Sequence, residues 1–337
     1  MYTVNKSYNE TLYQSKIFDF YFGSSSMGVF DIETTGLSPK YSQFILGGLL
    51  TTHPEGVQVQ QYFAESIVEE ADTLATYLKD MNDLDVLFSY NGDNFDLPFL
   101  KARTKHHGLN QNKEGNHRFP LQLSFDLYKV TNHFSDFRKF LPNLKQKTLE
   151  AFMGFWSQRA DVISGAESVY LYYDYLNSKD PSTRESILLH NLDDILQLSR
   201  LLKIFDKLDL HKIMFYMGFF VHGYKKKALV RKIQIKKDAV IISGHHQGNS
   251  MDYRNFGPDW EAIFQVHTGD FQIRIPCKTI KDYRVIDIES FSVDCSPLEK
   301  YAGYESGYLI IKDGPQVNYG EINHLSKLII GSILNHY

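Results

Sequence analysis

The sequence predicts an α/β protein with a mixed, five-stranded sheet flanked by helices, followed by a second module that is mainly antiparallel β. Residues 26–210 alternate strand-like and helix-like segments, which is the pattern of an α/β layer structure. Past residue 225, alternating strands with turn residues between them precede an amphipathic helix over residues 322–333. A chain of 337 residues is long enough for two domains. We therefore expect one domain over residues 1–211 and a second over residues 225–337.

The elements of the first domain follow from hydrophobic periodicity. Alternating or continuous short apolar runs predict strands, whereas apolar residues three and four apart predict helices. The predicted strands cover residues 28–33, 44–51, 57–63, 85–90 and 121–128, and the predicted helices cover residues 71–81, 96–107, 144–152, 166–176 and a long segment after residue 181. A polar loop is expected over residues 110–118. Proline is tolerated in a first helical turn, so Pro98 and Pro181 are compatible with helix starts.

Composition narrows the class of protein. The net charge of −4 does not predict the broad basic surface that grips long duplexes, although an enzyme that holds a few terminal nucleotides through metal ions needs fewer phosphate contacts. Two cysteines, Cys277 and Cys295, are too few for a disulfide framework or a zinc ribbon. The longest apolar stretch, residues 213–221, is too short to span a bilayer, and the first twenty residues lack the features of an export signal. We expect a cytoplasmic protein with no membrane association.

The first candidate motif is VFDIETTGLSP, at residues 29–39. Residues two apart on a strand point to the same face, so Asp31 and Glu33 project together. Phe30 and Ile32 are expected to pack behind them. Two carboxylates on one face repel each other unless a cation lies between them, and a divalent metal ion is the usual solution. For such a pair alone, a solvated polar face is the commoner explanation.

The turn after this strand has groups that suit a nucleotide. Thr34, Thr35 and Gly36 offer backbone N–H groups and hydroxyls that can hold a phosphate or a terminal nucleotide. Leu37 and Tyr90 can wedge against or stack on the terminal base, and they can equally pack in the core. The 22 Tyr and 24 Phe of the chain leave the same two options open, and core packing is the commoner use.

The second candidate motif is LFSYNGDNFDLPFL, at residues 87–100. Here a buried strand ends, a polar turn follows, and Asp96 lies at the start of a helix. The helix dipole favours a carboxylate at that position by about 0.3–1 kcal/mol, so simple capping explains Asp96 by itself. Ligands also collect at the carboxyl ends of strands in α/β sheets, which favours a functional role. Asp126, at the end of the next strand, is either an outer-shell group or a strand-end residue.

The third candidate motif is LLHNLDDILQL, at residues 188–198. Helical spacing places His190 and Asp194 on one face, beside Asn191. Asp193 points about 100° away, so we expect it to be solvated and Asp194 to be the ligand. His190 can accept a proton from water, position that water, or be a core histidine.

Together these motifs resemble the three exonuclease motifs of the DEDD superfamily of 3′–5′ exonucleases, which have an RNase H-like fold. The resemblance spans residues 29–202 and rests on Asp31-Ile-Glu33-Thr-Thr-Gly, Asn91 with Phe95-Asp96-x-Pro-x-Leu, and His190-Asn191-x-x-Asp194. The YprB-like ribonuclease H-like subgroup is the most similar branch, and the proofreading domains of family B DNA polymerases are more distant. One branch of the superfamily has a tyrosine four residues before the last aspartate and another has a histidine five before it. In this chain a histidine, His190, has the tyrosine spacing.

The resemblance implies a two-metal nuclease that hydrolyses single-stranded DNA or RNA from the 3′ end. Two divalent cations, Mg²⁺ or Mn²⁺, would be held by four carboxylates. A histidine would be a fifth catalytic residue, and six further residues would bind the substrate. The carboxylates are Asp31, Glu33, Asp96 and Asp194; the histidine is His190; the substrate residues are Thr34, Thr35, Gly36, Leu37, Tyr90 and Asn91. The alternative is a catalytically weak or inactive nucleic-acid-binding protein of the same fold. A proofreading module is a third option, and it would need a separate polymerase chain, whereas the sequence identifies no protein partner.

Overall fold

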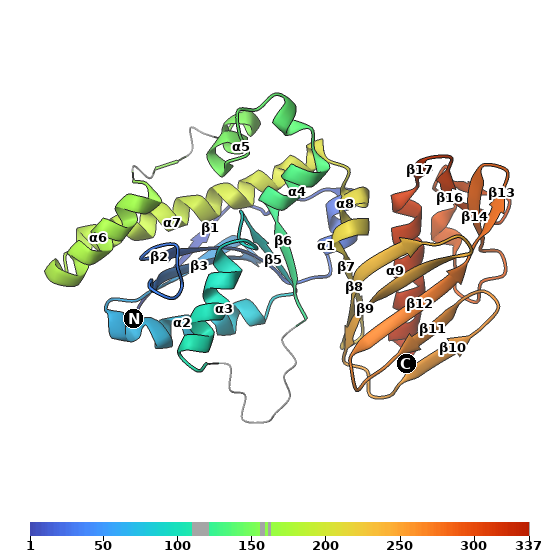
Figure 1. The fold of residues 1–337 in the computed structure, drawn as a ribbon, viewed down its shortest axis with the longest axis horizontal. Helices are drawn as coiled ribbons and strands as arrows, with labels where there is room; N and C mark the ends of the chain where they lie inside the picture. Colours follow the sequence, from blue (N-terminus) through green and yellow to red (C-terminus); the bar gives the residue numbers. More distant parts are fainter. Residues whose placement is uncertain (110–120, 156–158, 161–162, 337) are drawn as a thin grey trace. The chain divides into compact units, whose positions relative to one another are not determined.

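The structure is a computed structural model that describes residues 1–109, 121–155, 159–160 and 163–336 (Figure 1). The loop predicted at residues 110–118 lies outside the described residues. The chain forms two compact units, one of Met1–Ser15 with Ser26–Leu208 and the other of Lys16–Ser25 with Asp209–Tyr337. The expected division into one domain of residues 1–211 and a second, β-rich domain of residues 225–337 remains a proposal.

The first unit is built on one mixed sheet, in the strand order β1-β4-β3-β2-β5-β6. The four strands from β1 to β2 are antiparallel neighbours, whereas β5 and β6 continue the sheet in parallel. The predicted α/β class is confirmed, and β1 gives the sheet six strands in place of the predicted five. The strands are β1 (Tyr2–Tyr8), β2 (Met27–Thr34), β3 (Phe44–His53), β4 (Gly56–Phe63), β5 (Val86–Ser89) and β6 (Leu123–Asp126).

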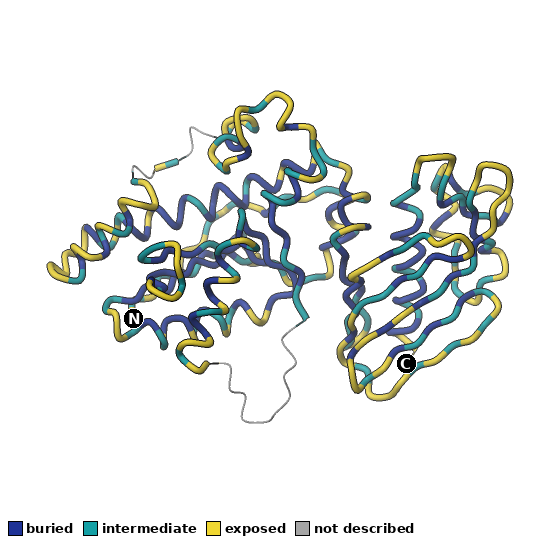
Figure 2. Tube along the Cα trace, in the orientation of Figure 1, coloured by how far each residue is buried: buried dark blue, intermediate teal, exposed yellow. Residues whose placement is uncertain are grey.

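Helices cover both faces of this sheet (Figure 1). On one face, α2 and α3 pack over a cluster that includes Phe30, Ile32 and Tyr77. On the other face, α6 and α7 enclose a second cluster that includes Phe63 and Tyr172. The helices are α2 (Glu70–Asn82), α3 (Asp96–His106), α4 (Leu127–Phe134), α5 (Gln146–Met153), α6 (Gly165–Ser178) and α7 (Pro181–Leu201). The strands between the helices are largely buried (Figure 2), as expected when both faces of a sheet are covered.

The end of β2 extends beyond its parallel neighbour. β5 pairs with β2 only over Met27–Val29, whereas β3 stays paired with β2 as far as Thr34. The end of β2, from Phe30 onward, therefore has one edge that β5 does not cover. Asp31 lies in this part of the strand, opposite Gly48 of β3. A Cβ at Gly48 would lie 2.2 Å from Asn191 Oδ1 and 2.1 Å from Ile195 Cδ1. The missing side chain thus allows α7 to approach the sheet beside Asp31.

The second unit contains the predicted antiparallel module, which is confirmed. Its two sheets have the orders β10-β11-β12-β9-β8-β7 and β13-β14-β16-β15, with β17 paired to β16. The strands are β7 (Phe219–Gly223), β8 (Lys226–Ile235), β9 (Ala239–Gln247), β10 (Tyr253–Phe256), β11 (Glu261–Phe264), β12 (Asp270–Pro276), β13 (Lys278–Ile280), β14 (Tyr283–Asp287), β15 (Tyr304–Glu305), β16 (Tyr308–Asp313) and β17 (Gln316–Val317). The helices are α1 (Lys16–Phe22), α8 (Leu210–Met217) and α9 (Tyr319–His336).

The longest apolar stretch does not form one element. It is divided between the end of α8 and the start of β7, and Gly218 stands at the junction with a φ of 93°, where a side chain would be strained. Within the described residues, no helix combines the length and the apolarity needed to cross a membrane.

Replacing Gly48 tests the close approach of α7. We expect Gly48→Ala to lower the free energy of unfolding by about 1–3 kcal/mol, because the added methyl group must displace both Asn191 and Ile195. Urea denaturation followed by circular dichroism measures this change. Gly331→Ala is the matched control, because its Cβ would lie 3.9 Å from the nearest atom, in ordinary contact. A Gly48→Ala protein as stable as the wild type would show that α7 has room to move.

Candidate metal centre and substrate pocket

The strand β2 presents Asp31 and Glu33 to one cavity. Phe30 and Ile32 belong to the buried cluster beneath α2 and α3. Glu33 is buried as well, whereas Asp31 is partly exposed. The carboxylates therefore stand at the wall of the cavity on a strand that the core fixes from behind.

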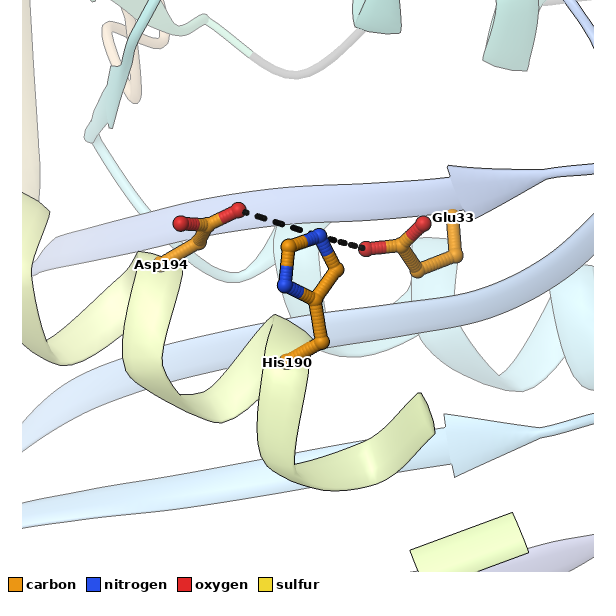
Figure 3. A group of neighbouring side chains, drawn as sticks. All are labelled: Glu33, His190 and Asp194. Carbon is orange, nitrogen blue, oxygen red and sulfur yellow. Dashed lines mark ion pairs between the residues drawn. The ribbon is translucent and has the colours of Figure 1, made fainter. Parts of the chain in front are cut away.

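The helix α7 brings His190 and Asp194 to the same place. His190 Nε2 lies 3.8 Å from Glu33 Oε1 and 3.8 Å from Asp194 Oδ2, so the imidazole stands between the two carboxylates (Figure 3). One ligand atom from each of these three residues lies within 4.8 Å of the others. This spacing is compatible with a single cation, and His190 is thereby a possible ligand as well as a possible base.

Asn191 connects α7 directly to β2. Its Nδ2 donates to Asp31 Oδ2 at 3.0 Å, and its Oδ1 accepts from Gln61 Nε2 at 2.9 Å. Gln61 also donates to the backbone oxygen of Leu188 at 2.8 Å. Because Gln61 fixes the orientation of the Asn191 amide, Asn191 can hold the Asp31 carboxylate in one position.

Asp96 reaches the cavity from the start of α3. Phe95 is the N-cap residue of this helix and Asp96 is its first residue, so the Asp96 carboxylate does not act as the N-cap. Its side chain accepts hydrogen bonds from the backbone N–H groups of Asp96 and Ile32. The bond to Ile32 places it at the edge of β2 that β5 leaves uncovered.

Burial and mutual repulsion both act on these acids. Burial raises the pKa of Asp31 well above its usual range, and the carboxylates of Asp96, Asp194 and Glu33 raise it further, against the hydrogen bond from Asn191. Burial also raises the pKa of Glu33 to about 7, although His190 opposes this shift. The pKa of Asp96 is about 7, again mainly because of burial. A cavity that disfavours carboxylate charge to this degree is expected to bind cations.

Arg159 is a site residue that the sequence analysis missed. Its Nη1 donates to Asp194 Oδ1 at 2.6 Å. Its Nε and Nη2 each donate at 2.7 Å to the two oxygens of Glu150, a buried carboxylate of α5. Burial lowers the pKa of Arg159, but Glu150 and Asp194 together raise it, so the guanidinium stays charged. The residue lies between two helices, where neither periodicity nor a motif marks it.

The prediction for Asp193 was wrong. Its side chain is buried and its Oδ2 accepts from the backbone N–H of Ala160 at 2.5 Å. Helical geometry turned Asp193 away from Asp194, as expected, but Ala160 lies against that side of α7. Asp193 therefore binds the backbone of Ala160 and is not exposed to solvent.

The turn after β5 is fixed by Asp126. Its carboxylate accepts from the backbone N–H of Asn91 at 2.8 Å and also caps α4. Asn91 has a φ of 64°, a conformation that asparagine tolerates better than most residues. Tyr90 donates its hydroxyl to the backbone oxygen of Leu144. Tyr90 and Asn91 both line the cavity, in a turn that hydrogen bonds hold from outside it.

The loop after β2 closes on itself at Thr35. The backbone N–H of Thr35 donates to the oxygen of Gln43 at 2.9 Å, and its hydroxyl accepts from the Gln43 N–H at 2.8 Å. Thr35 therefore joins the two ends of the loop, and it is not among the described residues that line the cavity. Thr34, Gly36 and the exposed Leu37 do line the cavity.

The cavity has a volume of about 950 Å³, near the upper end of the range for small-molecule sites. One part of its lining contains the predicted residues, and another part comes from α5 and α6 and was not predicted. The predicted part is Asp31, Glu33, Thr34, Gly36, Leu37, Tyr90, Asn91, Asp96, His190 and Asp194; the unpredicted part includes Lys147, Ser164, Gly165, Ala166, Val169, Tyr170 and Tyr173.

The donor set fits divalent cations. Carboxylate oxygens are the preferred protein ligands of Mg²⁺ and Mn²⁺, and one imidazole is compatible with Mn²⁺. Glu33, His190 and Asp194 have the required spacing for one ion. Asp31 and Asp96 supply two further carboxylates to the same cavity. The residues present therefore suit the metal ions that the sequence motifs imply.

Comparison with known proteins shows that the part of the chain that contains this site matches a known family. Residues 29–206 of the 337 match the family model described as the RNase_H superfamily. A DNA polymerase of Methanocaldococcus jannaschii is 29% identical over 90 residues, which cover 23% of this chain and 6% of that protein.

Two solved structures resemble the chain at low identity. The family B DNA polymerase of Pyrobaculum calidifontis is 21% identical, with a TM-score of 0.40, and the likeness covers 57% of this chain and 25% of that one. Exonuclease I of E. coli, in complex with a 5cy-dA13 oligonucleotide, is 10% identical, with a TM-score of 0.36, and the likeness covers 65% of this chain and 54% of that one. The likeness thus spans about half or less of the length of each of these proteins.

Metal ions are expected to stabilise the protein in a pH-dependent way. Without metal, a carboxyl whose folded pKa is raised to about 7 stabilises the fold when protonated, and this stabilisation is lost as the pH rises through about 7. We therefore expect the melting temperature in EDTA to fall between about pH 5 and about pH 8. Mn²⁺ should restore it, and more so at the higher pH, because the cation replaces bound protons.

Differential scanning calorimetry of the wild type, Asp31→Asn and Asp136→Asn measures this effect. Asp136 is the control, because its side chain is 75% exposed and pairs with Lys139 at the surface. An equal Mn²⁺ shift for the wild type and Asp31→Asn at both pH values would contradict a cation site at Asp31.

Proposed function

The chain belongs to the RNase H superfamily, and from this membership we propose that it is a metal-dependent 3′–5′ exonuclease that hydrolyses phosphodiester bonds of single-stranded nucleic acid. The observation that carries the proposal is the convergence of four carboxylates on one cavity. Asp31 and Glu33 come from β2, Asp96 comes from α3, and Asp194 comes from α7. Such a set of acids, three with raised pKa values, has no evident structural use and is typical of a cation site in a nuclease.

Two divalent cations, Mg²⁺ or Mn²⁺, are part of this proposal. Glu33 and Asp194 would hold one ion, Asp96 would support the other, and Asp31 would contact both. When bound, such ions stabilise the charge that develops on the attacking and leaving oxygens of an in-line displacement. The raised pKa values imply that protons compete with the ions, so binding is expected to be weaker at low pH.

The residues of the chain bind and orient the substrate in this proposal. His190 is buried beside Glu33 and Asp194, and its imidazole can accept the proton of an attacking water or hold that water in line. Thr34 and Gly36 lie where backbone groups can contact the terminal nucleotide, and Leu37 is exposed at the rim where it can wedge against the base. Tyr90 is the weaker candidate for stacking, because Leu144 already accepts its hydroxyl hydrogen.

The finer assignment to the YprB-like subgroup of the DEDD exonucleases rests on the motifs and remains a proposal. The principal alternative is a nucleic-acid-binding protein of the same fold that has little or no activity. The presence of all four carboxylates in one cavity favours the enzyme over this alternative.

The activity is tested with single-stranded oligonucleotides labelled at the 5′ end, incubated with Mg²⁺ or Mn²⁺. We expect a ladder that shortens from the 3′ end, and a phosphorothioate at the last linkage should block it. Asp31→Asn removes one charge at constant shape and should lower the rate at least about a hundredfold, because cation binding contributes several kcal/mol.

Asp136→Asn serves as the matched control and should have wild-type activity. Wild-type activity of Asp31→Asn would refute the assigned site. Binding of the oligonucleotide without turnover in either metal would favour the inactive alternative, and release of nucleotides from the 5′ end would refute the direction.

Arg159 is expected to act as a positioning residue for Asp194. Glu150 accepts from both Nε and Nη2 along one edge of the guanidinium, and this leaves Nη1 pointing at Asp194 Oδ1. In Arg159→Lys the charge remains near Glu150, but the ammonium cannot make both contacts. We expect the affinity for Mn²⁺, measured by calorimetric titration, to fall about 10- to 100-fold.

Arg200→Lys is the matched control for this substitution. Arg200 makes a similar two-pronged pair with Glu10, and it does not line the cavity. A fall in Mn²⁺ affinity in Arg159→Lys but not in Arg200→Lys would support the positioning role. Equal melting temperatures of the two variants in EDTA would separate this role from a general loss of stability. Unchanged Mn²⁺ affinity in Arg159→Lys would contradict it.

A further inference from the structure

The helix α6 carries two pairs of tyrosines on two different faces. Tyr172 and Tyr175 are buried, and both pack edge-on against Phe63 in the core. Tyr170 and Tyr173 have the same spacing of three residues but point elsewhere: they are 76% and 47% exposed. Core packing thus explains the first pair. Of the second pair, Tyr173 contacts the ring of Tyr172 along one side, with ring centroids 6.2 Å apart, and both rings remain largely outside the core.

The exposed pair lines the same cavity as the carboxylates. One wall of this cavity is formed by Val169, Tyr170 and Tyr173 of α6, whereas the acids come from β2, α3 and α7. Within the described part of the chain, neither of the two hydroxyls has a hydrogen-bond partner. Two aromatic rings are therefore presented to the cavity, where water contact with their faces is unfavourable.

Other groups on this wall suit a phosphate. Lys147 of α5 and the first turn of α6, with Gly165 and Ala166, line the cavity beside the tyrosines. The Ser164 side chain accepts from the Glu167 N–H, so that capping box completes the helix start. The lysine favours anions, whereas aromatic rings favour flat, apolar faces. The Glu167 carboxylate accepts from the Ser164 N–H at 2.7 Å, so the helix start itself is already occupied by an acid. A nucleotide combines an anionic phosphate with a flat base, and it is complementary to this wall as a whole.

We propose that Tyr170 and Tyr173 form a stacking platform for unpaired nucleobases next to the scissile phosphodiester. This inference rests on the proposed function, since it assigns the bases of the same substrate to α6. Stacking on tyrosine tolerates any base, because every base has a π-face. The platform would select for single strands, because the bases of a duplex are already stacked on one another and do not offer their faces.

The platform is tested by binding, in EDTA and in Ca²⁺, of a single-stranded oligonucleotide that carries 2-aminopurine near its 3′ end. Stacking on a tyrosine quenches the fluorescence of this base. We expect Tyr170→Ala/Tyr173→Ala to bind at least about tenfold more weakly than the wild type and to lose the quenching. Tyr170→Phe/Tyr173→Phe keeps both rings and should bind and quench as the wild type does.

Two controls separate base stacking from other effects. Tyr224→Ala removes a ring that is 78% exposed and does not line the cavity, so it should leave binding unchanged. An oligonucleotide whose last three nucleotides are abasic should bind the wild type and the double alanine variant equally, because only the bases contact the rings. Wild-type binding and quenching by the double alanine variant would overturn the platform. The platform would also be overturned if the double alanine substitution weakened binding of the abasic strand as much as binding of the intact strand.

Hydrolysis measured on the same proteins distinguishes this inference from the proposed function. Quenching that depends on Tyr170 and Tyr173, in a protein that hydrolyses no oligonucleotide, would support the platform and refute the exonuclease. Hydrolysis that is equally fast in the wild type and the double alanine variant, with equal KM, would support the exonuclease and overturn the platform.

Discussion

The repulsion among carboxylates gathered at the end of β2 is the constraint on which the rest of the site depends. Asp31 and Glu33 share one face of the strand, and Asp96 and Asp194 are brought to the same cavity by two helices. Burial, with repulsion between neighbouring carboxylates, raises the pKa of Asp31, Glu33 and Asp96 and so disfavours their charges. An arrangement of this kind costs stability, so the surrounding fold must hold it together.

The fold meets this cost with uncharged contacts and one arginine. Asn191 holds Asp31, and backbone N–H groups hold Asp96. Arg159 donates to Asp194, and Glu150 keeps the guanidinium in place. Asp31, Asp96 and Asp194 are thus each held at one side, while the cavity remains open to a cation and a substrate on the other.

The lining of the cavity has an acidic part and a part with aromatic and basic side chains. The acids lie on β2, α3 and α7, where the two hydrophobic clusters fix the backbone on either side of the sheet. The tyrosines and Lys147 lie on α6 and α5, which reach the cavity from outside the sheet. In the proposed function the first surface would hold the reacting phosphodiester, and the second would hold the nucleotides next to it.

The sequence by itself determined the local geometry of the site. The two-residue period of a strand put Asp31 with Glu33, and the period of a helix put His190 with Asp194, because both depend only on neighbouring residues in the chain. The classes of the two parts of the chain followed from the same periodicities. The strand β1 escaped prediction because Tyr2 and Val4 are its few apolar contacts with the core, too weak a pattern for an edge strand.

Only the tertiary structure decided which distant residues meet. Asp193 is buried where it accepts a hydrogen bond from the backbone N–H of Ala160, 33 residues away in the chain. The pairing of Arg159 with Asp194 joins residues 35 apart, and no local period relates them. Likewise, the sequence of α6 contains four tyrosines at helical spacing, but which pair is buried depends on where the helix docks on β4 and α7. Packing between elements, which pattern alone does not encode, made these choices.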